Sequence, residues 1–406
     1  MSVFEIDGPD IAKLSDSDLR TLVGLLCEAE LQRKHLPTTS VTYGGNQDAA
    51  DGGLDVLISV PPDTSMELPV PGSITGYQVK AKPMSPAAIK KEMKPGGVLR
   101  PIFSQLAGAR GAYVIVSSKD SVTHTQMLKR EQAMRSAVAD LLNSSGLELH
   151  FFDQGRLATW VRDHPGVVVW VRARIRRELR QWKPYEQWTS SDLKYFTDEA
   201  VRIIGPHSEE LNASDAMARI RSVLANPGGV VRLVGLSGVG KTRFAQALFE
   251  GDISGRPIDH TLAVYTDLGT SPYPSPLDMA TELNASRRRA TLVIDNCPSD
   301  AHSELVKVCL EPGSQLSLLT IEYDIQDDRP EGTNVYKFDT ASEGLVRKII
   351  RARFPRISHF DADRVARFLG GNPRTFGIEF DAIAPDLRAA RNEMERSSLS
   401  YTGVDH

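Results

Sequence analysis

Eight consecutive residues in the middle of the chain, Gly235–Thr242, have the types and spacing of a phosphate-binding loop. They read Gly-Leu-Ser-Gly-Val-Gly-Lys-Thr and match the Walker A pattern G-x-x-x-x-G-K-[ST]. Glycines let backbone N–H groups close around phosphate at the positive end of the helix that follows. We expect Lys241 to contact the β- and γ-phosphates of ATP, and the Thr242 hydroxyl to bind Mg²⁺. The glycines that shape the loop are Gly235, Gly238 and Gly240.

A carboxylate that would complete this site follows about fifty residues later. Residues Ala290–Asp295 form an apolar run that ends in an acid, which is typical of a buried strand. We expect Asp295 to be the Walker B carboxylate and to hold Mg²⁺ together with Thr242. The next residue is Asn296, where many ATPases have a second acid that positions water. Because an amide is a poor base, the sequence favours slow hydrolysis, or a switch held by bound nucleotide, over a motor.

A second group of polar residues, much earlier in the chain, suits phosphodiester cleavage. Asp55 opens one strand-like run, and Gln78 and Lys80 end the next. Alternation along a strand places Gln78 and Lys80 on one face. Asp55 and Gln78 would hold Mg²⁺, which polarises the scissile phosphate and lowers the pKa of the attacking water. Lys80 would orient that water or stabilise the developing charge. The [DEQ]-x-K spacing recurs elsewhere in the chain, so the assignment depends on the predicted strand.

Glu30 is the candidate acid on the first long helix, which we predict over residues 16–34. It continues the apolar stripe of that helix, whereas Glu28 lies off the stripe. A carboxylate on an apolar stripe is costly unless it is paired or bound to metal. We therefore choose Glu30 for the catalytic set; the alternative is a glutamate in the last turn that merely turns to solvent. The apolar stripe consists of Leu19, Val23 and Leu26.

Composition sets the broad class of the protein. The chain has 406 residues, of which 41% are hydrophobic and 25% charged, with a net charge of −4. These values are typical of soluble globular proteins with two or three domains. The three cysteines show no C-x-x-C spacing, which argues for a reducing cytoplasm and against zinc. The N-terminus lacks the regions of a signal peptide, and no apolar run approaches about 18 residues, so we expect no membrane span.

The elements that must position the candidate residues alternate between helix and strand. This order predicts an α/β fold with an N-terminal mixed sheet flanked by helices, followed by a parallel sheet around the Walker A loop and a helical lid. An arginine-rich helix is predicted over residues 170–182, where it could neutralise DNA phosphates or form a solvated or interdomain face. Strands are expected at 54–60, 74–80, 112–117, 147–152, 230–234, 261–265, 290–294 and 316–321.

The N-terminal residues resemble a known nuclease superfamily. The glycine-rich approach Gly44–Asp55, together with Tyr77–Lys80, resembles the PD-(D/E)xK restriction-endonuclease-like proteins and, within them, the Mrr-type branch, in which Gln replaces the second acid. The resemblance covers about residues 15–155. It implies a metal-dependent nuclease in which Asp55 and Gln78 bind Mg²⁺ and Lys80 acts in catalysis.

A turn about 130 residues after the Walker A loop carries a second resemblance. Residues Gly370–Pro373 read Gly-Gly-Asn-Pro, which suits a helix C-cap and turn. Together with the Walker A loop and the Walker B strand, this element resembles the STAND signal-transduction NTPases, relatives of AAA+ proteins. The resemblance implies that Pro373 lies next to the adenine of ATP. Many members end the strand at 318–323 in Ser-Arg or Thr-Arg. This chain has Glu-Tyr there, which leaves Arg374 as the weak candidate for a sensor arginine.

The order of the two parts resembles that of bacterial antiviral STAND proteins. It implies an antiphage defence effector whose nucleotide-dependent homo-oligomerisation activates Mg²⁺-dependent cleavage of double-stranded DNA. An NTP-dependent restriction endonuclease and a nucleotide-binding scaffold with a degenerate nuclease fold remain open as alternatives. Recognition of a phage component is expected from a further sensor domain or a separate partner. The expected parts are a nuclease-like domain at 1–155, a helical extension and linker at 156–200, a STAND NTPase domain at 201–340 and a helical lid at 341–406.

Overall fold

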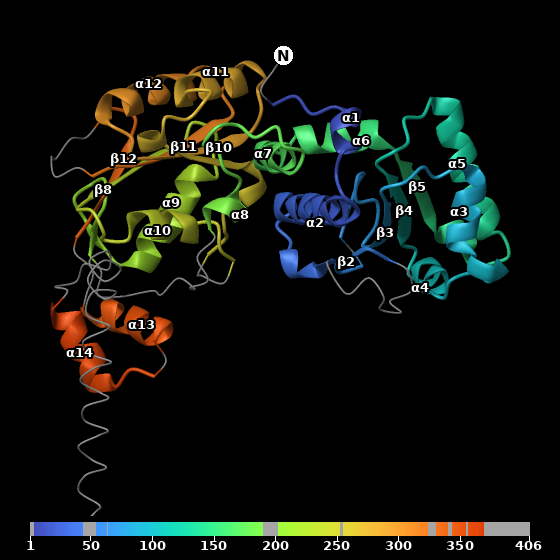
Figure 1. Ribbon diagram of the computed structural model, residues 1–406, viewed down its shortest axis with the longest axis horizontal. Helices are drawn as coiled ribbons and strands as arrows, with labels where there is room; N and C mark the ends of the chain where they lie inside the picture. The colour runs from blue at the N-terminus through green and yellow to red at the C-terminus, as the bar shows by residue number, and fades with distance from the viewer. Residues whose placement is uncertain are drawn as a thin grey trace, which may run out of the picture. The chain divides into compact units, whose positions relative to one another are not determined.

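The computed structural model of the protein divides into two compact units (Figure 1). One unit comprises residues 1–188, 259–293 and 308–317, and the other comprises residues 189–258, 294–307 and 318–406. The glycine-rich approach at 44–53, Pro373 and Arg374 lie outside the described residues. The structure describes residues 4–43, 54–62, 64–189, 202–251, 255–323, 330–339, 343–354 and 356–368.

A five-stranded mixed sheet forms the centre of the N-terminal part; the sequence predicts a mixed sheet here with four of these strands, and the short strand at 41–43 was not predicted. Its first three strands pair antiparallel, and its last three pair parallel. The third strand lies in the middle of the sheet, and helices cover both faces of the sheet there, which accounts for its run of buried residues. The strands, in sheet order, are β1 (Val41–Tyr43), β2 (Val56–Ser59), β3 (Ile74–Lys80), β4 (Ala112–Ser117) and β5 (Glu148–Phe152).

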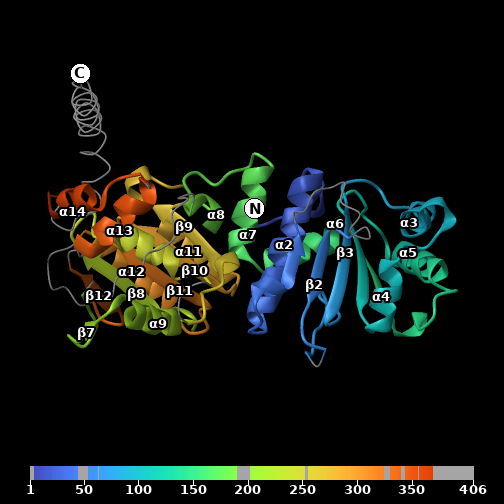
Figure 2. The same cartoon turned by 90° about the horizontal axis from the view of Figure 1, so that it is seen from below.

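Helices cover both faces of this sheet (Figure 2). The long helix α2 (Asp16–Arg33) lies on one face, and its predicted apolar stripe is buried. The opposite face carries α3, α4 and α5, which enclose a core where the ring of Phe103 meets Tyr113 edge-on at 4.7 Å. The other helical elements of this part are α1 (Gly8–Ile11), η1 (Thr38–Ser40), α3 (Pro86–Met93), η2 (Pro95–Gly97), α4 (Ile102–Gly108), α5 (His124–Ala137), η3 (Ser144–Gly146), α6 (Gln154–Arg162), α7 (Pro165–Arg174) and α8 (Tyr185–Trp188).

The Walker A loop belongs to a seven-stranded sheet whose strands are divided between the two units. Its centre is parallel, as predicted, although the central strand at 334–338 was not predicted; two short edge strands pair antiparallel, so the whole sheet is mixed. Strands of two residues have no readable periodicity, which is why the sequence did not indicate them. In sheet order the strands are β7 (Glu210–Leu211), β6 (Ile203–Ile204), β12 (Asn334–Phe338), β8 (Val230–Gly235), β11 (Leu316–Ile321), β10 (Ala290–Asp295) and β9 (Ala263–Asp267).

Helices and short helical turns surround this sheet and follow it. The last two helices form a hairpin that packs Val346 and Ile350 against Ala362 and Ala366, which agrees with the helical pattern predicted there. Among the described helices, none is long and apolar enough to cross a membrane. The elements are α9 (Ala213–Leu224), α10 (Lys241–Ala247), η4 (His260–Leu262), η5 (Leu268–Thr270), α11 (Pro276–Ala285), α12 (Ser299–Cys309), α13 (Glu343–Arg353) and α14 (His359–Phe368).

Within the first unit, α7 and the segment after it pack against η4 and β9. Gly166 of α7 is required at this contact, because a Cβ there would lie 2.7 Å from the carbonyl oxygens of Thr261 and Ala263. Trp188 stacks on Tyr265 with ring centroids 4.6 Å apart. The four tryptophans are all buried, so they serve packing rather than base stacking.

Candidate nucleotide site and candidate nuclease site

The backbone of the Walker A loop has the conformation that its glycines permit. Gly235, Gly238 and Gly240 have φ values of 139°, 87° and 94°, a region that residues with a Cβ rarely adopt. At Gly235 a Cβ would also lie 2.5 Å from the carbonyl oxygen of Phe338 on the neighbouring strand β12. The loop leads directly into α10, whose first residue is Lys241.

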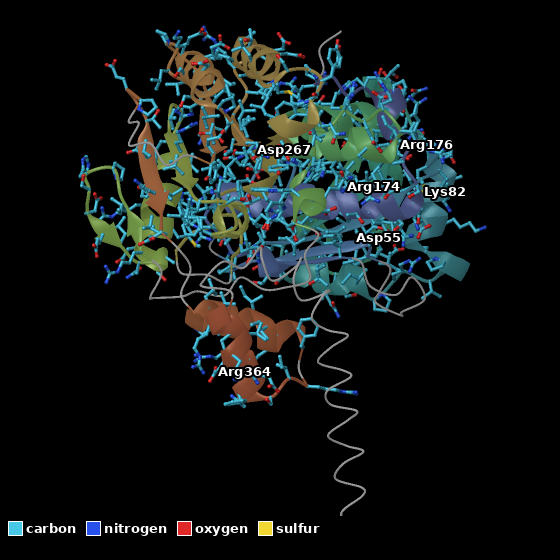
Figure 3. The ribbon with its side chains drawn as sticks, turned by 60° about the vertical axis from the view of Figure 1, so that its left-hand side comes forward. Asp55, Lys82, Arg174, Arg176, Asp267 and Arg364 are labelled. Atoms are coloured by element: carbon cyan, nitrogen blue, oxygen red, sulfur yellow. The ribbon has the colours of Figure 1, made fainter. Side chains whose placement is uncertain are left out.

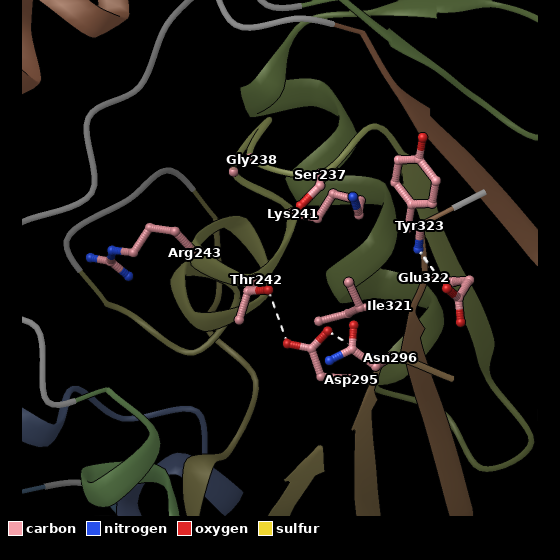
Figure 4. A pocket seen from close by; sticks show the side chains of 11 residues that line it. Ser237, Gly238, Lys241, Thr242, Arg243, Asp295, Asn296, Ile321, Glu322 and Tyr323 are labelled. Carbon is pink, nitrogen blue, oxygen red and sulfur yellow. Dashed lines mark hydrogen bonds between the residues drawn. The ribbon is translucent and has the colours of Figure 1, made fainter. Parts of the chain in front are cut away.

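Lys241, Thr242 and Asp295 meet at the end of the central strands (Figure 4). Lys241 Nζ donates to the carbonyl oxygens of Gly235 and Leu236, at 2.7 and 2.8 Å. Thr242 Oγ1 donates to Asp295 Oδ2 at 3.0 Å, and Asp295 Oδ1 accepts from the backbone N–H of Asn296 at 2.9 Å. The structure therefore brings the predicted Walker A and Walker B residues together.

These residues line a cavity of about 460 Å³. Burial lowers the pKa of Lys241, and the negative charges of Asp295 and Glu322 oppose that effect. The hydroxyl of Thr242 beside a carboxylate oxygen is a donor set that suits Mg²⁺, a hard cation that prefers oxygen ligands. The described lining residues are Ser237, Gly238, Gly240, Lys241, Thr242, Arg243, Asp295, Asn296, Ile321, Glu322 and Tyr323.

Asp55 and Gln78 also lie together, as the sequence predicts. Gln78 Nε2 donates to Asp55 Oδ2 at 2.6 Å, and the backbone N–H of Val79 donates to the same oxygen at 2.7 Å. On the other side, Arg20 Nε of α2 lies 2.9 Å from Asp55 Oδ1, and Arg20 also bonds Asp16 in the first turn of that helix. Burial raises the pKa of Asp55, although the Val79 N–H and the charge of Arg20 partly oppose the rise.

Lys80 is on the same strand as Gln78 and follows the predicted alternation, but its charge is already paired. Its Nζ lies 3.2 Å from Glu92 Oε1 of α3. Arg100 Nη2 lies 3.1 Å from the same oxygen. Two cations therefore share one half-buried carboxylate at this end of the sheet.

A divalent cation does not fit the Asp55 cluster in this arrangement. Both oxygens of Asp55 are engaged, one by Arg20 and the other by two N–H donors. Gln78 Oε1 is buried and accepts no hydrogen bond from the described residues, so it is one oxygen available for a ligand. Within the described stretches, no three His, Cys, Asp or Glu side chains are arranged to hold a metal ion.

Glu30 is buried, as predicted, but it does not join this cluster. Arg20 contacts Asp55, and Glu30 follows ten residues later, so it lies about 15 Å further along the helix. Its Oε1 accepts from Trp160 Nε1 at 2.9 Å, and Arg33 Nη1 lies 3.3 Å from its Oε2. Burial acts to raise the pKa of Glu30, but His164, Arg33 and Trp160 together lower it below the ordinary value. The geometry thus gives Glu30 a packing role and supplies no support for a catalytic one.

The arginine-rich segment differs from the prediction. Helix α7 ends at Arg174 instead of continuing to residue 182, and Arg176 has a φ of 59°. The guanidinium of Arg174 lies over the Trp170 ring at 5.0 Å, with its Nε 3.7 Å from Asp18 Oδ1. Part of this positive charge therefore serves the packing of the unit. Figure 3 labels three exposed cations of the same unit, Lys82, Arg174 and Arg176, together with Asp55.

Sequence reasoning missed three charged residues at the two sites. Arg20 and Glu92 contact Asp55 and Lys80 from other elements, and no local pattern marks such long-range pairs. Glu322 follows the predicted strand at 316–321, where the resemblance to STAND proteins led us to expect an arginine and not an acid. An ionisable residue directly after a buried parallel strand was the signal that could have identified it.

No family model matches the chain, and no curated protein matches it. Among solved structures, a Signal Transduction ATPase with Numerous Domains (STAND) protein with a tetratricopeptide repeat sensor from Pyrococcus horikoshii is similar at 15% identity and a TM-score of 0.28. That match covers 40% of this chain and 28% of the other. A chain of the HORMA:CdnC:Trip13 complex from E. coli MS115-1 matches at 12% identity and a TM-score of 0.28, covering 38% of this chain and 69% of that one. Trip13 from Rhizobiales matches at 13% identity and a TM-score of 0.24, covering 37% and 60%. Likenesses this distant carry no functional conclusion.

Proposed function

We propose that the protein is a nucleotide-dependent switch whose Walker A loop binds ATP with Mg²⁺. The observation that supports this most directly is the hydrogen bond between Thr242 Oγ1 and Asp295 Oδ2, which joins the two predicted halves of the site. Thr242 and Asp295 would hold the Mg²⁺, which neutralises phosphate charge when bound. Lys241 would exchange its two carbonyl contacts for the β- and γ-phosphates.

Equilibrium binding of a fluorescent ATP analogue tests this proposal. We expect Lys241→Ala to weaken binding in the presence of Mg²⁺ by about tenfold or more, because a charge-assisted contact to phosphate is lost. Lys307→Ala is the matched control, since Lys307 is an exposed lysine on α12. Equal affinity of the wild type and Lys241→Ala would show that the loop is not the nucleotide site.

We further propose that the N-terminal part is a latent DNA endonuclease. The observation that favours this second function is the assembly of Asp55, Gln78 and Lys80 at one end of the sheet, with a buried Gln78 oxygen still available. Ion pairs to Arg20 and Glu92 occupy the charges that cleavage would need. The proposal therefore requires that the Arg20–Asp55 pair opens before double-stranded DNA is cut.

Nicking of a supercoiled plasmid with Mg²⁺ and ATP tests the nuclease. We expect Asp55→Asn and Lys80→Met to lose cleavage, whereas Lys82→Met, an exposed lysine two residues further on, retains it. Unchanged cleavage in Asp55→Asn would favour the alternative of a scaffold with a degenerate nuclease fold. Strong stimulation of ATP hydrolysis by DNA would instead favour an NTP-dependent restriction enzyme.

The complete proposal has three steps and serves antiphage defence. First, a sensor domain or partner detects a phage component. ATP binding then promotes homo-oligomerisation, which brings nuclease sites together for double-strand cleavage. The support is the presence of a candidate nucleotide site and a charge-paired nuclease-like site in one chain. Light scattering with and without ATP, on the wild type and Lys241→Ala, tests the assembly step. Full-rate cleavage by a monomer, independent of Lys241, would exclude the hypothesis that ATP-dependent assembly activates the nuclease.

A further inference from the structure

Glu322 directly follows strand β11. Its main chain is held between β8 and β10, the two strands that carry the candidate nucleotide-site residues. In the sheet, β11 lies between β8, which leads into the Walker A loop, and β10, which ends at Asp295. The backbone N–H of Glu322 donates to Leu233 O of β8 at 3.0 Å. From the other side, Cys297 N donates to Ile321 O at 3.0 Å. The main chain at Glu322 is thus held on both sides, at the edge where parallel strands present their functional residues.

The side chain of Glu322 lines the same cavity as the phosphate-site residues (Figure 4). It is half-buried, and its Oε1 accepts from the backbone N–H of Tyr323 at 2.8 Å. This bond orients the carboxyl group, and among the described residues Oε2 has no hydrogen-bond or ion-pair partner. The charge of Glu322 acts on Lys241, where it opposes the lowering of the pKa by burial, so the two groups lie within electrostatic reach.

The other polar residues of the cavity are poorly suited to activate water. Asp295 accepts from Thr242 and from the Asn296 N–H, which commits its two oxygens. The amide of Asn296 accepts no proton at neutral pH, and Lys241 is a cation. Among the described residues that line the cavity, the carboxylates are Asp295 and Glu322. Of these two carboxylates, Asp295 is a proposed Mg²⁺ ligand and Glu322 is not. Glu322 can therefore accept a proton from water without giving up a role in binding the metal.

We propose that Glu322 is the general base for ATP hydrolysis. It would replace the second acid that many ATPases have at the position of Asn296. This inference rests on the proposed nucleotide site. A water oxygen attacks the γ-phosphorus, and the bond from that phosphorus to the β–γ bridging oxygen breaks. The bonding electron pair stays on the bridging oxygen of ADP, and the proton of the water passes to Glu322 Oε2. Glu322 then releases the proton to inorganic phosphate or solvent.

A base in this position has a second effect, because its negative charge repels the γ-phosphate. Glu322→Gln keeps the shape but removes both the charge and the basicity. We expect its turnover number to fall by about 100-fold or more, the usual effect of losing a general base, while its Kd for ATP stays equal or decreases. A residue with only a structural role would weaken binding and turnover together. Glu322→Asp keeps the base one methylene shorter, so we expect intermediate turnover.

The experiment measures phosphate release and, separately, binding of the fluorescent ATP analogue, on the full chain with Mg²⁺. Glu304→Gln, on the exposed side of α12, is the matched control and should behave as the wild type. The inference fails if Glu322→Gln turns over within about threefold of the wild type, if it loses ATP binding, or if the wild type releases no more phosphate than Lys241→Ala. In contrast, equal ATP binding by the wild type and Lys241→Ala overturns the proposed nucleotide site itself, so the two failures are distinguishable.

Discussion

Replacement of Arg20 tests whether the Asp55 cluster is a metal site closed by an internal cation. Arg20 Nε lies 2.9 Å from Asp55 Oδ1, and the two side chains are only 20% and 13% exposed. At an effective dielectric constant of about 20, charges about 4 Å apart attract by about 4 kcal/mol. Both groups keep some contact with water, so we take about half of this attraction, about 2 kcal/mol. This is the free energy that separating Arg20 from Asp55 subtracts from the binding of a metal cation.

Arg20→Met removes this competitor and keeps most of the apolar stem. Because 1.4 kcal/mol corresponds to a tenfold change in affinity, we expect Mn²⁺ to bind about 30-fold more tightly to Arg20→Met than to the wild type. Electron paramagnetic resonance of free Mn²⁺ in a titration without nucleotide measures this directly. Arg33→Met, on the same helix, is the matched control. Its Nη1 pairs with Glu30 and its side chain is 55% exposed.

Two results would refute this reasoning. One is equal Mn²⁺ affinity of Arg20→Met and the wild type, which would mean that the guanidinium does not compete for the site. The other is a gain that persists in the double variant Arg20→Met/Asp55→Asn, which would place the bound ion elsewhere.

Three further predictions concern single side chains. Burial raises the pKa of Glu28 from 4.5 to about 7, so the unfolded chain loses this proton first and stability falls as pH rises through that window. We expect Glu28→Gln to be more stable than the wild type at pH 8 by up to about 3 kcal/mol, with little difference near pH 4.5, in urea titrations followed by tryptophan fluorescence. Glu30→Gln should lower the unfolding free energy at pH 7 by about 1–2 kcal/mol, because the partners of Glu30 lose the negative charge that they stabilise. Plasmid nicking should stay unchanged. If nicking is lost while the urea midpoint stays at the wild-type value, Glu30 is catalytic after all. Thr242→Val removes the hydroxyl that bonds Asp295, so ATP binding should weaken by about tenfold with Mg²⁺ and stay the same with EDTA; equal weakening in both buffers would contradict this.

The geometry of the candidate nucleotide site was predictable because its parts are local in sequence. The loop Gly235–Thr242 is contiguous, and Asp295 ends a strand whose apolar run is readable. Once the strands form a parallel sheet, their carboxyl ends meet at one edge, so the contact between Thr242 and Asp295 follows from topology. Glu322 obeys the same rule, since it follows β11 directly, but its acidic character did not fit the arginine expected at that place.

Glu30 shows where local reasoning ends. Glu30 is buried, as predicted, although α2 is buried around most of its circumference, and the cost of burying a carboxylate correctly required a partner. One oxygen of Glu30 is held by Trp160, which is 130 residues away in sequence, and the other is paired with Arg33 of the same helix. No pattern within the helix could distinguish an indole N–H from a metal ion, because both compensate the same charge. Likewise, the sequence predicts that Arg20 lies in a helix, but its pairing with Asp55 depends on how α2 packs against the sheet.

The two candidate sites differ in what a ligand must displace, and this difference gives the proposed switch a physical basis. At the nucleotide site Lys241 donates to two neutral carbonyl oxygens, which a phosphate can replace with a stronger charge-assisted contact. At the Asp55 cluster a phosphodiester and a cation must separate two ion pairs, Arg20 from Asp55 and Lys80 from Glu92, in a half-buried setting. Binding at the first site therefore needs little rearrangement, whereas cleavage at the second needs a movement of α2 or α3. If the proposed nuclease rests in this charge-paired state, it would stay inactive until such a movement occurs, and we propose that ATP binding at the candidate nucleotide site triggers it.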